Sequence, residues 1–561
     1  MTEFVQQISD DWRAVNWPKV ERTVFRLQQR IYRASQRGDT RTVKSLQRLL
    51  STSWSARMLA VRRVTQENKG KKTAGVDGIA SLKAPERTDL AKNLTLDKKA
   101  DPVRRVLIPK PGKQSEYRKL GIPTMRDRAK QALAKLALEP QWEALFAPNS
   151  YGFRPGRSPQ DALEQVHRCI CQKPKWVLDA DIAACFDKIS HSPLVAQLAQ
   201  SHPSIARQCK AWLKAGVVDD GQTQATHEGV PQGGVISPLL ANIALHGLES
   251  LVKTTIKGAH LVRFADDFVV FHHDREAIFK AQTLIRQWLS SRGLAIRADK
   301  TRIVHTLNGG AEYPTGFDFL GCHVRQYRTR RRSINKSQRP YKTLIKPSKA
   351  SLKRLVTKLG EIIKRHRGCS QEALITALNP IIVGWANYHR SNVASRIFAY
   401  LDSVLYWQLR RWARRRHPNQ NRKWVRARYW HTVGRRHWVF GVKQSGEVTL
   451  KLAKFSDMSI RRHVKVRGHK SWYDGDWAYW AARRGKHPMI HIREAILLKR
   501  QRGRCPICRS VFDIHDSIER DHVRPIARGG RDVYDNLQLL HLVCHHQKTS
   551  WDKQGWCPVR L

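Results

Sequence analysis

Hydrophobic and polar residues recur along the chain with two periods, one typical of helices and one typical of strands. Residues 20–66 have apolar positions at helical spacing with many arginines between them, which predicts two amphipathic basic helices. The run VRRVLIPKPGKQSEYRKLGIPT at 103–124 predicts two strands joined by a basic Pro/Gly turn, and residues 127–146 predict a helix. WVLDADIAACF at 176–186 is typical of a buried strand that runs into a helix. Because strands and helices alternate to about residue 325, the pattern indicates an α+β or α/β region.

One pair of short apolar runs encloses two acidic residues. In LVRFADDFVVF, residues 261–271, Asp266 and Asp267 lie between runs rich in aromatic and branched residues. A two-residue connection between such runs predicts a hairpin, and Asp tolerates the positive φ that tight turns require. The two aspartates are explained either as ordinary turn formers or as ligands of a divalent metal. The metal interpretation requires a further carboxylate elsewhere in the chain.

The charge of the chain changes this picture. The sequence has 103 Lys and Arg against 46 Asp and Glu, a formal net charge of +57 and a pI near 10.7. Self-repulsion on this scale works against folding, so a polyanionic partner explains the charge, and nucleic acid is the favoured one. A membrane surface explains it less well, because no apolar run approaches the ~18 residues that a spanning helix needs. The first residues include early acids and no apolar core, so no secretory signal is predicted.

The excess of positive charge is largest in residues 323–440, which have 29 Lys and Arg against three acids. The segments 352–366 and 372–412 have the pattern of helices with one basic face. A basic face is often only solvated, but an imbalance of this size favours contact with nucleic acid. In RKWVRARYWHTVGRRHWVF at 422–440, aromatic residues interleave with arginine, as stacking on bases requires. The alternative is that these aromatic residues form the core of a small domain.

A second source of carboxylates is VLDADIAACFDKISH at 177–191. Asp179 and Asp181 follow a buried strand and share one of its faces, so Asp181 can project from the strand end toward a neighbouring hairpin. Two divalent ions roughly 3.5–4 Å apart stabilise the attacking and leaving oxygens of phosphoryl transfer, and carboxylates are their natural ligands. Asp181, Asp266 and Asp267 supply the number of carboxylates that such a site needs.

Four of the ten cysteines lie in the last 57 residues, and their spacing indicates metal rather than disulfides. Cys505 and Cys508 form a C-x2-C pair, and His541 and Cys544 form an H-x2-C pair. Together they are a tetrahedral set suited to Zn²⁺. The simpler interpretation of this module is a purely structural zinc ribbon. The six other cysteines are scattered, as reduced residues of a cytosolic protein are.

The order of these motifs resembles that of the reverse transcriptases encoded by bacterial group II introns, the maturase family, over essentially the whole chain. The segments that carry the resemblance are IPKPG and YRKLGIPT, GFRPGRSPQDAL, DADIAACFDKISH, GVPQGGVISPLLANIAL, RFADDFVVF, RGLAIRADKTRIVH, FDFLGCHV and GWANYHR. Two departures are Phe264, where Tyr is commoner in the family, and Cys185, which replaces a frequent aromatic residue. Neither removes a metal ligand, so we expect activity to survive.

The resemblance implies a role for each of several residues. Asp181, Asp266 and Asp267 resemble the palm carboxylates that hold two Mg²⁺ ions, and the carbonyl of Ile182 is expected to join the metal shell. Phe186 falls where the family's steric gate excludes ribonucleotides. The remaining residues are expected to contact the incoming nucleotide: Lys110, Arg118, Gln232 and Lys300. Lys and Arg suit that task because they neutralise triphosphate charge.

Between the two cysteine pairs, ERDHVRPIARGGRDVYDNLQLL at 519–540 resembles the HNH endonucleases. This resemblance implies two strands and a helix around one divalent ion, with Asp521 and His545 as ligands and His522 activating the attacking water. Asn536 would brace the loop of His522. Neutral imidazole is a suitable base because its ordinary pKa of ~6.5 is close to working pH. His546 is a second imidazole beside His545, so the residue types alone do not choose between them.

These expectations define a multidomain α+β protein. Its predicted parts are an N-terminal RNA-binding extension with the start of the fingers (1–84), fingers and palm with an antiparallel sheet (85–325), a helical thumb or maturase domain (326–420), a basic DNA-binding segment (421–490) and a small ββα-metal HNH domain (491–561).

The resemblance implies an RNA-directed DNA polymerase that also binds its own intron RNA, promotes splicing and nicks target DNA for target-primed reverse transcription in intron mobility. The expected partners are intron RNA, target DNA and dNTPs, with no membrane, in the bacterial cytoplasm. The alternative is a maturase that folds RNA without an active polymerase, and a plain DNA nuclease on a basic scaffold is a third hypothesis. The three palm carboxylates, the PQG loop and the HNH positions are all present, which favours the enzyme.

Overall fold

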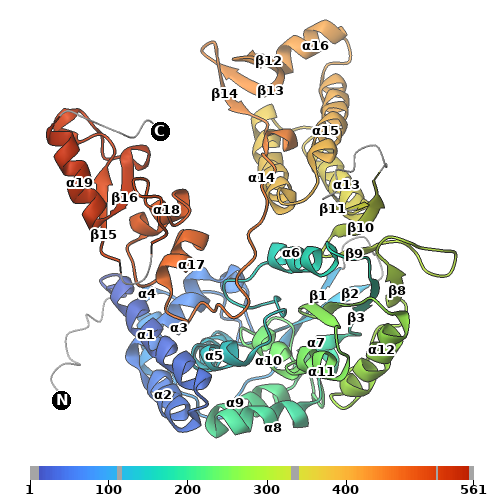
Figure 1. The fold of residues 1–561 in the computed structure, drawn as a ribbon, viewed down its shortest axis with the longest axis vertical. Helices are drawn as coiled ribbons and strands as arrows, with labels where there is room; N and C mark the ends of the chain where they lie inside the picture. Colours follow the sequence, from blue (N-terminus) through green and yellow to red (C-terminus); the bar gives the residue numbers. More distant parts are fainter. Residues whose placement is uncertain (1–11, 110–115, 330–339, 513–515, 555–561) are drawn as a thin grey trace.

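The computed structural model describes residues 12–109, 116–329, 340–512 and 516–554. A central body of mixed sheets and helices carries two projections (Figure 1), one made of α13 to α16 with β12 to β14 and one made of the C-terminal elements. The mixed α and β architecture expected from the sequence is confirmed. Lys110, expected to grip the triphosphate, lies outside the described residues.

Three helices open the described chain, where the sequence pattern predicted two. They are α1 (Trp17–Gln36), α2 (Thr40–Thr52) and α3 (Trp54–Arg62), followed by a π-helical turn (Arg63–Glu67), a 3-10 turn (Lys69–Lys72) and α4 (Ala84–Lys92). The second break comes at Ser53, whose extended backbone (ψ 130°) ends one helix and starts the next without a glycine or proline. The buried faces of these helices join one core with the long helix α5 (Met125–Leu145).

The strand pair predicted at 103–124 is present as β1 (Val103–Pro109) and β2 (Tyr117–Ile122). They form an antiparallel hairpin within a four-stranded sheet of order β2-β1-β4-β5, completed by β4 (Val217–Asp219) and β5 (Gln222–Gln224). The outer end of the hairpin is exposed, and it bears the apolar side chains of Leu107 and Ile108 together with basic residues. This sheet corresponds to the expected fingers.

A second four-stranded sheet, fully antiparallel with the order β6-β7-β3-β8, lies at the centre of the body. Its strands are β3 (Trp176–Asp181), β6 (His260–Phe264), β7 (Asp267–His272) and β8 (Arg302–His305). The surrounding helices are α6 (Pro159–Ile170), α7 (Cys185–Lys188), α8 (His191–Ser201), α9 (Pro203–Lys214), α10 (Ser237–Ala244), α11 (Leu248–Thr255) and α12 (Arg275–Ser290). The middle of the sheet is apolar on both faces, which matches the unbroken hydrophobic runs of β6 and β7.

A three-stranded sheet of β9 (Phe317–Phe319), β10 (Cys322–Arg328) and β11 (Tyr341–Pro347) leads to the first projection. The projection has three long helices: α13 (Lys349–Arg365), α14 (Gln371–His389) and α15 (Ser395–Arg416). Beyond them come α16 (Arg422–Tyr429), β12 (Trp430–Val433), β13 (Arg436–Gln444), β14 (Glu447–Lys451) and a 3-10 turn (Phe455–Asp457). Tyr429, Trp430 and Phe440 are buried in the same core as the three helices, so the structure is continuous across the boundary expected at 420.

The C-terminal projection contains α17 (Trp477–Arg484), α18 (Ile492–Arg500), β15 (Ile518–His522), 3-10 turns (Ile526–Arg528 and Tyr534–Asn536), β16 (Leu537–His541) and α19 (Leu542–Lys553). Asp161 on α6 binds the segment that precedes α17 and so connects this segment to the palm. Its fully buried carboxylate accepts hydrogen bonds from the Val466 amide (2.7 Å) and His463 Nε2 (2.9 Å) and pairs with Arg483. Burial opposes ionisation, but these partners outweigh it and hold the pKa of Asp161 well below its usual range.

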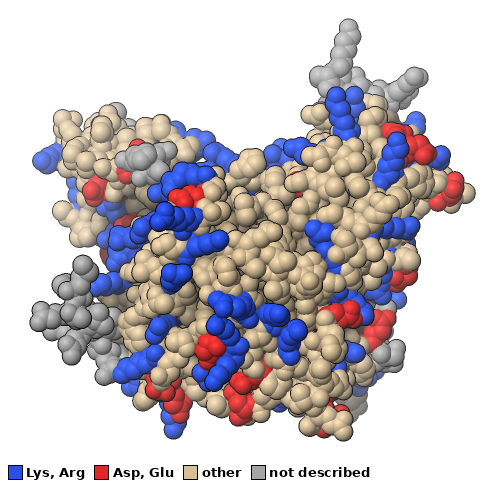
Figure 2. All heavy atoms as spheres, turned by 90° about the horizontal axis from the view of Figure 1, so that it is seen from below, with Lys and Arg blue, Asp and Glu red and all other residues tan. Residues whose placement is uncertain are grey.

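Basic side chains are widespread on the surface. Figure 2 shows one face on which Lys and Arg lie in several groups and acidic side chains are fewer. In the described part of the chain, no helix is both long enough and apolar enough to cross a bilayer.

Candidate active site and metal centre

The two acidic segments singled out in the sequence meet at one end of the palm sheet. Asp181, the last residue of β3, lies directly opposite Asp267, the first residue of β7. The turn of the hairpin consists of Ala265 and Asp266, not of the two aspartates as the sequence suggested, because Asp267 already pairs with Phe264. Ala265 carries the positive φ (59°), so neither aspartate serves as the left-handed turn former.

The loop that contains Gly152 packs closely against the turn at Ala265. A Cβ on Gly152 would come within 2.3 Å of the Ala265 amide nitrogen, so only glycine fits there. Arg263, only 3% exposed, donates hydrogen bonds to the Ala265 carbonyl (2.9 Å), Asn242 Oδ1 (3.1 Å) and Ser150 Oγ (2.7 Å). Sequence reasoning missed Arg263. The sequence did offer one indication of its role: Arg263 is a lone cation inside an apolar strand, and a buried cation must be hydrogen-bonded.

The carboxylates repel one another. Burial, Asp266 and Asp181 raise the pKa of Asp267 to about 7, and burial raises that of Asp266 as well. Burial and the nearby charge of Asp267 raise the pKa of Asp179 to about 7. Cations approach Asp181: Lys300 Nζ lies 2.6 Å from its Oδ2, and a guanidinium nitrogen of Arg297 lies 4.0 Å from the same oxygen. A site that destabilises its own negative charge in this way favours bound cations.

Other predicted residues surround the carboxylates. The amide of Ile182 donates to the Asp266 carbonyl (3.3 Å), which ties the end of β3 to the turn. Phe186, on α7, packs edge-on against Phe153 with ring centroids 6.0 Å apart. Arg118 extends from the fingers hairpin, and its charge lowers the pKa of Asp266 against the larger effect of burial. The structure therefore brings Ile182 and Arg118 close to the carboxylates at one end of the sheet.

The loop that contains Gln232 contacts strand β2 of the fingers. The Gln232 carbonyl accepts a hydrogen bond of 2.7 Å from the Gly121 amide. The next residue, Gly233, has a φ of 123°, and a Cβ there would lie 2.8 Å from the Gly121 carbonyl oxygen. The glycine of the PQG motif is thus required by close approach of two backbones.

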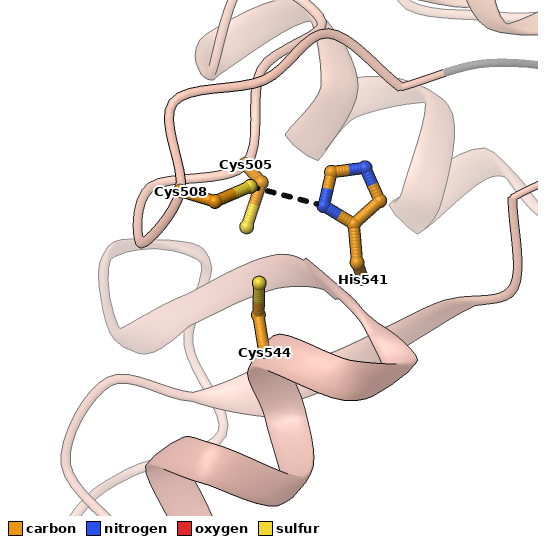
Figure 3. Close-up of side chains that lie close together, drawn as sticks. All are labelled: Cys505, Cys508, His541 and Cys544. Atoms are coloured by element: carbon orange, nitrogen blue, oxygen red, sulfur yellow. Dashed lines mark hydrogen bonds between the residues drawn. The ribbon is translucent and has the colours of Figure 1, made fainter.

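The four residues predicted as a tetrahedral set come together in the C-terminal domain. One ligand atom from each of Cys505, Cys508, His541 and Cys544 lies within 4.8 Å of all the others. Figure 3 shows the three sulfur atoms and the imidazole converging, with Cys508 Sγ 3.3 Å from His541 Nδ1. Desolvation opposes ionisation of Cys508, but hydrogen bonds from Ser510 and from neighbouring thiols lower its pKa to about 6. Three sulfurs and one nitrogen at this spacing fit a tetrahedral metal ion.

Of the HNH positions, His522 lies at the end of β15 and His545 on α19, and Asn536 ends the 3-10 turn before β16. Asp521 on β15 and His545 on α19 approach to 3.8 Å, whereas His546 is exposed on the next face of the helix. Asn536 braces the loop after His522 by accepting from the Arg524 amide (2.8 Å) and donating to the Arg524 and Arg531 carbonyls (2.9 Å each). Sequence reasoning missed Lys548, which is buried with its ammonium 3.1 Å from Asp521.

A palm sheet with three aspartates at one end, together with a basic fingers hairpin and a helical thumb, defines the class of protein as a nucleic-acid polymerase. Family models agree along the chain: "N-terminal domain of reverse transcriptase" matches residues 12–94 and "Reverse transcriptase (RNA-dependent DNA polymerase)" matches 108–324. "Group II intron, maturase-specific domain" matches residues 352–430, and "HNH endonuclease" matches 505–550.

Curated relatives point the same way. Protein YkfC of Escherichia coli is 31% identical over 334 residues, which span 51% of this chain and 84% of YkfC. The group II intron-encoded protein LtrA of Lactococcus lactis is 36% identical over 192 residues, 33% of this chain and 31% of LtrA. Maturase-like protein 1 of Euglena gracilis is 27% identical over 389 residues, 67% of this chain and 76% of that protein. The chain belongs to the group II intron-encoded proteins, with reverse transcriptase, maturase and HNH endonuclease domains.

Proposed function

We propose that the palm extends a DNA primer on an RNA template with two Mg²⁺ ions held by Asp181, Asp266 and Asp267. The observation that carries this proposal is the placement of the three carboxylates at adjacent strand ends, where burial and mutual repulsion raise the pKa values of Asp266 and Asp267. Hard oxygen ligands of this kind suit Mg²⁺, and the ions, when bound, would stabilise the attacking and leaving oxygens. Lys300, which already pairs with Asp181, would exchange that carboxylate for the phosphates of the substrate.

The incoming dNTP is assigned to the space between palm and fingers. Arg118 and Lys110 would neutralise its triphosphate, and Gln232 would support the base from the loop held by Gly121. The carbonyl of Ile182 would contribute to the metal shell. Phe186, braced by Phe153, would exclude a 2′-hydroxyl and so select deoxynucleotides.

In the C-terminal domain we assign Cys505, Cys508, His541 and Cys544 to a structural Zn²⁺ ion, and Asp521 and His545 to a catalytic divalent ion. His522 would act as the base that activates water, in the orientation that Asn536 sets through the Arg524 backbone. The 3.8 Å approach of His545 to Asp521 and the exposure of His546 support His545 as the ligand.

The partners are intron RNA and target DNA. The excess of 29 basic over three acidic residues in 323–440 supports binding of the RNA by the thumb, where it would aid splicing. The segment 421–490 is assigned to DNA contact. The HNH domain would nick one DNA strand, and the palm would extend the exposed 3′ end with intron RNA as template. A maturase without polymerase activity is less well supported, because a decayed palm would not keep three facing carboxylates.

Target-primed synthesis separates the two active sites in one experiment. The ribonucleoprotein is given either an intact DNA target or the same target already nicked, and dNTP incorporation at the nick is measured. We expect His522→Ala to abolish incorporation on the intact target and to retain it on the nicked one. Asp267→Asn should abolish both. Equal incorporation by His522→Ala on both targets would contradict the assignment of nicking to the HNH domain.

A further inference from the structure

A pocket of about 310 Å³ opens between α15, α16 and β13, at the outer end of the thumb projection (Figure 1). Three aromatic side chains form its apolar part: Tyr406, Trp430 and Trp438. Five cations surround them: Arg410, Arg414, Arg422, Lys423 and Arg426. Its size is at the lower end for small-molecule sites, close to one nucleotide rather than a helical groove.

The cations of this pocket lack an acidic partner among the described residues. Arg416 and Arg436, which lie nearby in sequence, are held by the Arg367 carbonyl (2.8 Å) and by Asp457 (2.6 Å). In contrast, none of the five pocket cations forms a salt bridge with a residue in the described part of the chain, and no acidic residue lines the pocket. Five positive charges collected without a counter-charge are costly unless a polyanion binds there.

The aromatic rings are placed for stacking. Trp438 is 49% exposed, and Arg426 lies over its ring at 4.7 Å from the centroid. Tyr406 meets Trp438 with centroids 6.0 Å apart at 60°, and it meets Trp430 at 5.6 Å. Trp430, which also lines the pocket, is buried. A planar base can therefore lie against Trp438 and Arg426 with its edge toward Tyr406.

A backbone irregularity directs Trp438 to this position. The pairing of β12 with β13 shifts in register between His431 and Val433, so that two residues of β13 face one residue of β12. Trp438 is one of the two, and its φ is 63°, a left-handed value that a bulky residue rarely adopts. Residues held at such backbone angles cluster at active and binding sites.

We propose that this pocket binds one unpaired nucleotide of a single-stranded nucleic acid, with its base on Trp438 and its flanking phosphates on the arginines. A paired base cannot enter without leaving its stack, so duplex of the same sequence is excluded. The inference rests on the proposed nucleic-acid function and names the kind of strand that this part of the thumb holds. The strand is either the displaced DNA of the target or an unpaired loop of the RNA.

Photo-cross-linking tests the pocket in the full-length protein. Short DNA and RNA oligomers with one 5-iodouracil are irradiated with the protein, and the cross-linked peptides are mapped. We expect cross-links at Trp438 or Tyr406 that unlabelled single strand competes away and duplex does not. The oligomer, DNA or RNA, with the higher yield identifies the source of the strand. Cross-links confined to other regions would overturn the proposal.

A matched pair of variants provides the second readout. Trp424 is also exposed (39%) and lies on α16, but it does not line the pocket. Base stacking contributes ~1–3 kcal/mol, so Trp438→Ala should weaken binding of a single strand by about 5- to 150-fold, and Trp424→Ala should not. With an abasic strand of equal charge, Trp438→Ala and the unchanged protein should bind equally. Equal loss on both strands, or none on either, would overturn the proposal, whereas failure of all RNA binding would refute the proposed function itself.

Discussion

Replacement of Arg263 by methionine should misplace the catalytic turn without touching a carboxylate. The guanidinium is buried, and its three hydrogen bonds join the Ala265 carbonyl, Asn242 and Ser150. Desolvation lowers the pKa of Arg263 to about 10, so the side chain stays charged at neutral pH. Methionine has a similar volume and makes none of these bonds.

The magnitude follows from the acceptors left behind. Each buried acceptor without a donor costs about 1–3 kcal/mol, and three acceptors set a range of about 3–9 kcal/mol. Removal of a desolvated charge and entry of water offset part of this loss, so we expect the free energy of unfolding of the palm to fall by about 3–4 kcal/mol. Misplacement of reacting groups by ~1 Å can cost 10²-fold in rate, so primer extension should fall about that far.

Urea unfolding followed by tryptophan fluorescence, together with primer extension on an RNA template, measures both effects. Arg263→Lys keeps the charge but cannot make all three hydrogen bonds of the guanidinium. It should therefore lose less stability and less primer extension than Arg263→Met, and more than the control. Arg286→Met, at an exposed position of α12, is the matched control and should change neither. Wild-type stability and extension in Arg263→Met would refute the reasoning that this buried network positions the turn.

Three further predictions concern the segment that precedes α17, the metal centre and the PQG loop. Asp161→Asn should lower the thermal midpoint at pH 7. Because the pKa of this carboxylate is depressed in the folded state, its contribution to stability is complete above ~pH 4 and is lost as the pH falls further. A difference in thermal midpoint between the two proteins that stays constant down to pH 3 would refute this prediction. Cys508→Ser should reduce bound zinc, measured by mass spectrometry, and abolish nicking while primer extension persists; Cys369→Ser, at an exposed thumb position, is the control. Gly233→Ala should raise the KM for dNTPs at least several-fold because its Cβ meets the Gly121 carbonyl at 2.8 Å. Gly221→Ala, where φ is also positive (82°) but the Cβ meets open space, should not.

Much of the fold could be predicted because its signals are local. Hydrophobic runs and turn residues predicted the fingers hairpin, the helix expected at 127–146 and found at Met125–Leu145, and the strand that carries Asp181, and the cysteine spacing predicted the metal cluster. The third N-terminal helix was missed because the break between α2 and α3 comes from the extended backbone of Ser53 alone, and no glycine or proline marks it in the sequence. The turn at Ala265 was misassigned because two adjacent acids are a stronger turn signal than alanine.

Contacts between distant segments were beyond the reach of pattern reasoning. Asp161 bonds locally to Ser158, but its other partners, His463, Val466 and Arg483, lie more than 300 positions away, and nothing local to α6 indicates them. Likewise, some aromatic residues of 422–440 are buried and others are exposed, and the sequence does not distinguish the two groups. Tyr429 and Phe440 pack into the thumb core, as the small-domain interpretation held, while Trp438 is turned outward by a bulge.

The central claim is that the three palm carboxylates catalyse DNA synthesis on RNA. Its most direct test is primer extension on an RNA template with Mg²⁺ and dNTPs, comparing the unchanged protein with Asp266→Asn and with Asp220→Asn, an exposed aspartate in the turn after β4. The account predicts extension by the unchanged protein and by Asp220→Asn, and loss of at least about 10²-fold in Asp266→Asn with RNA binding retained. Extension by Asp266→Asn at the unchanged rate, or no extension by any of the three despite tight RNA binding, would contradict it.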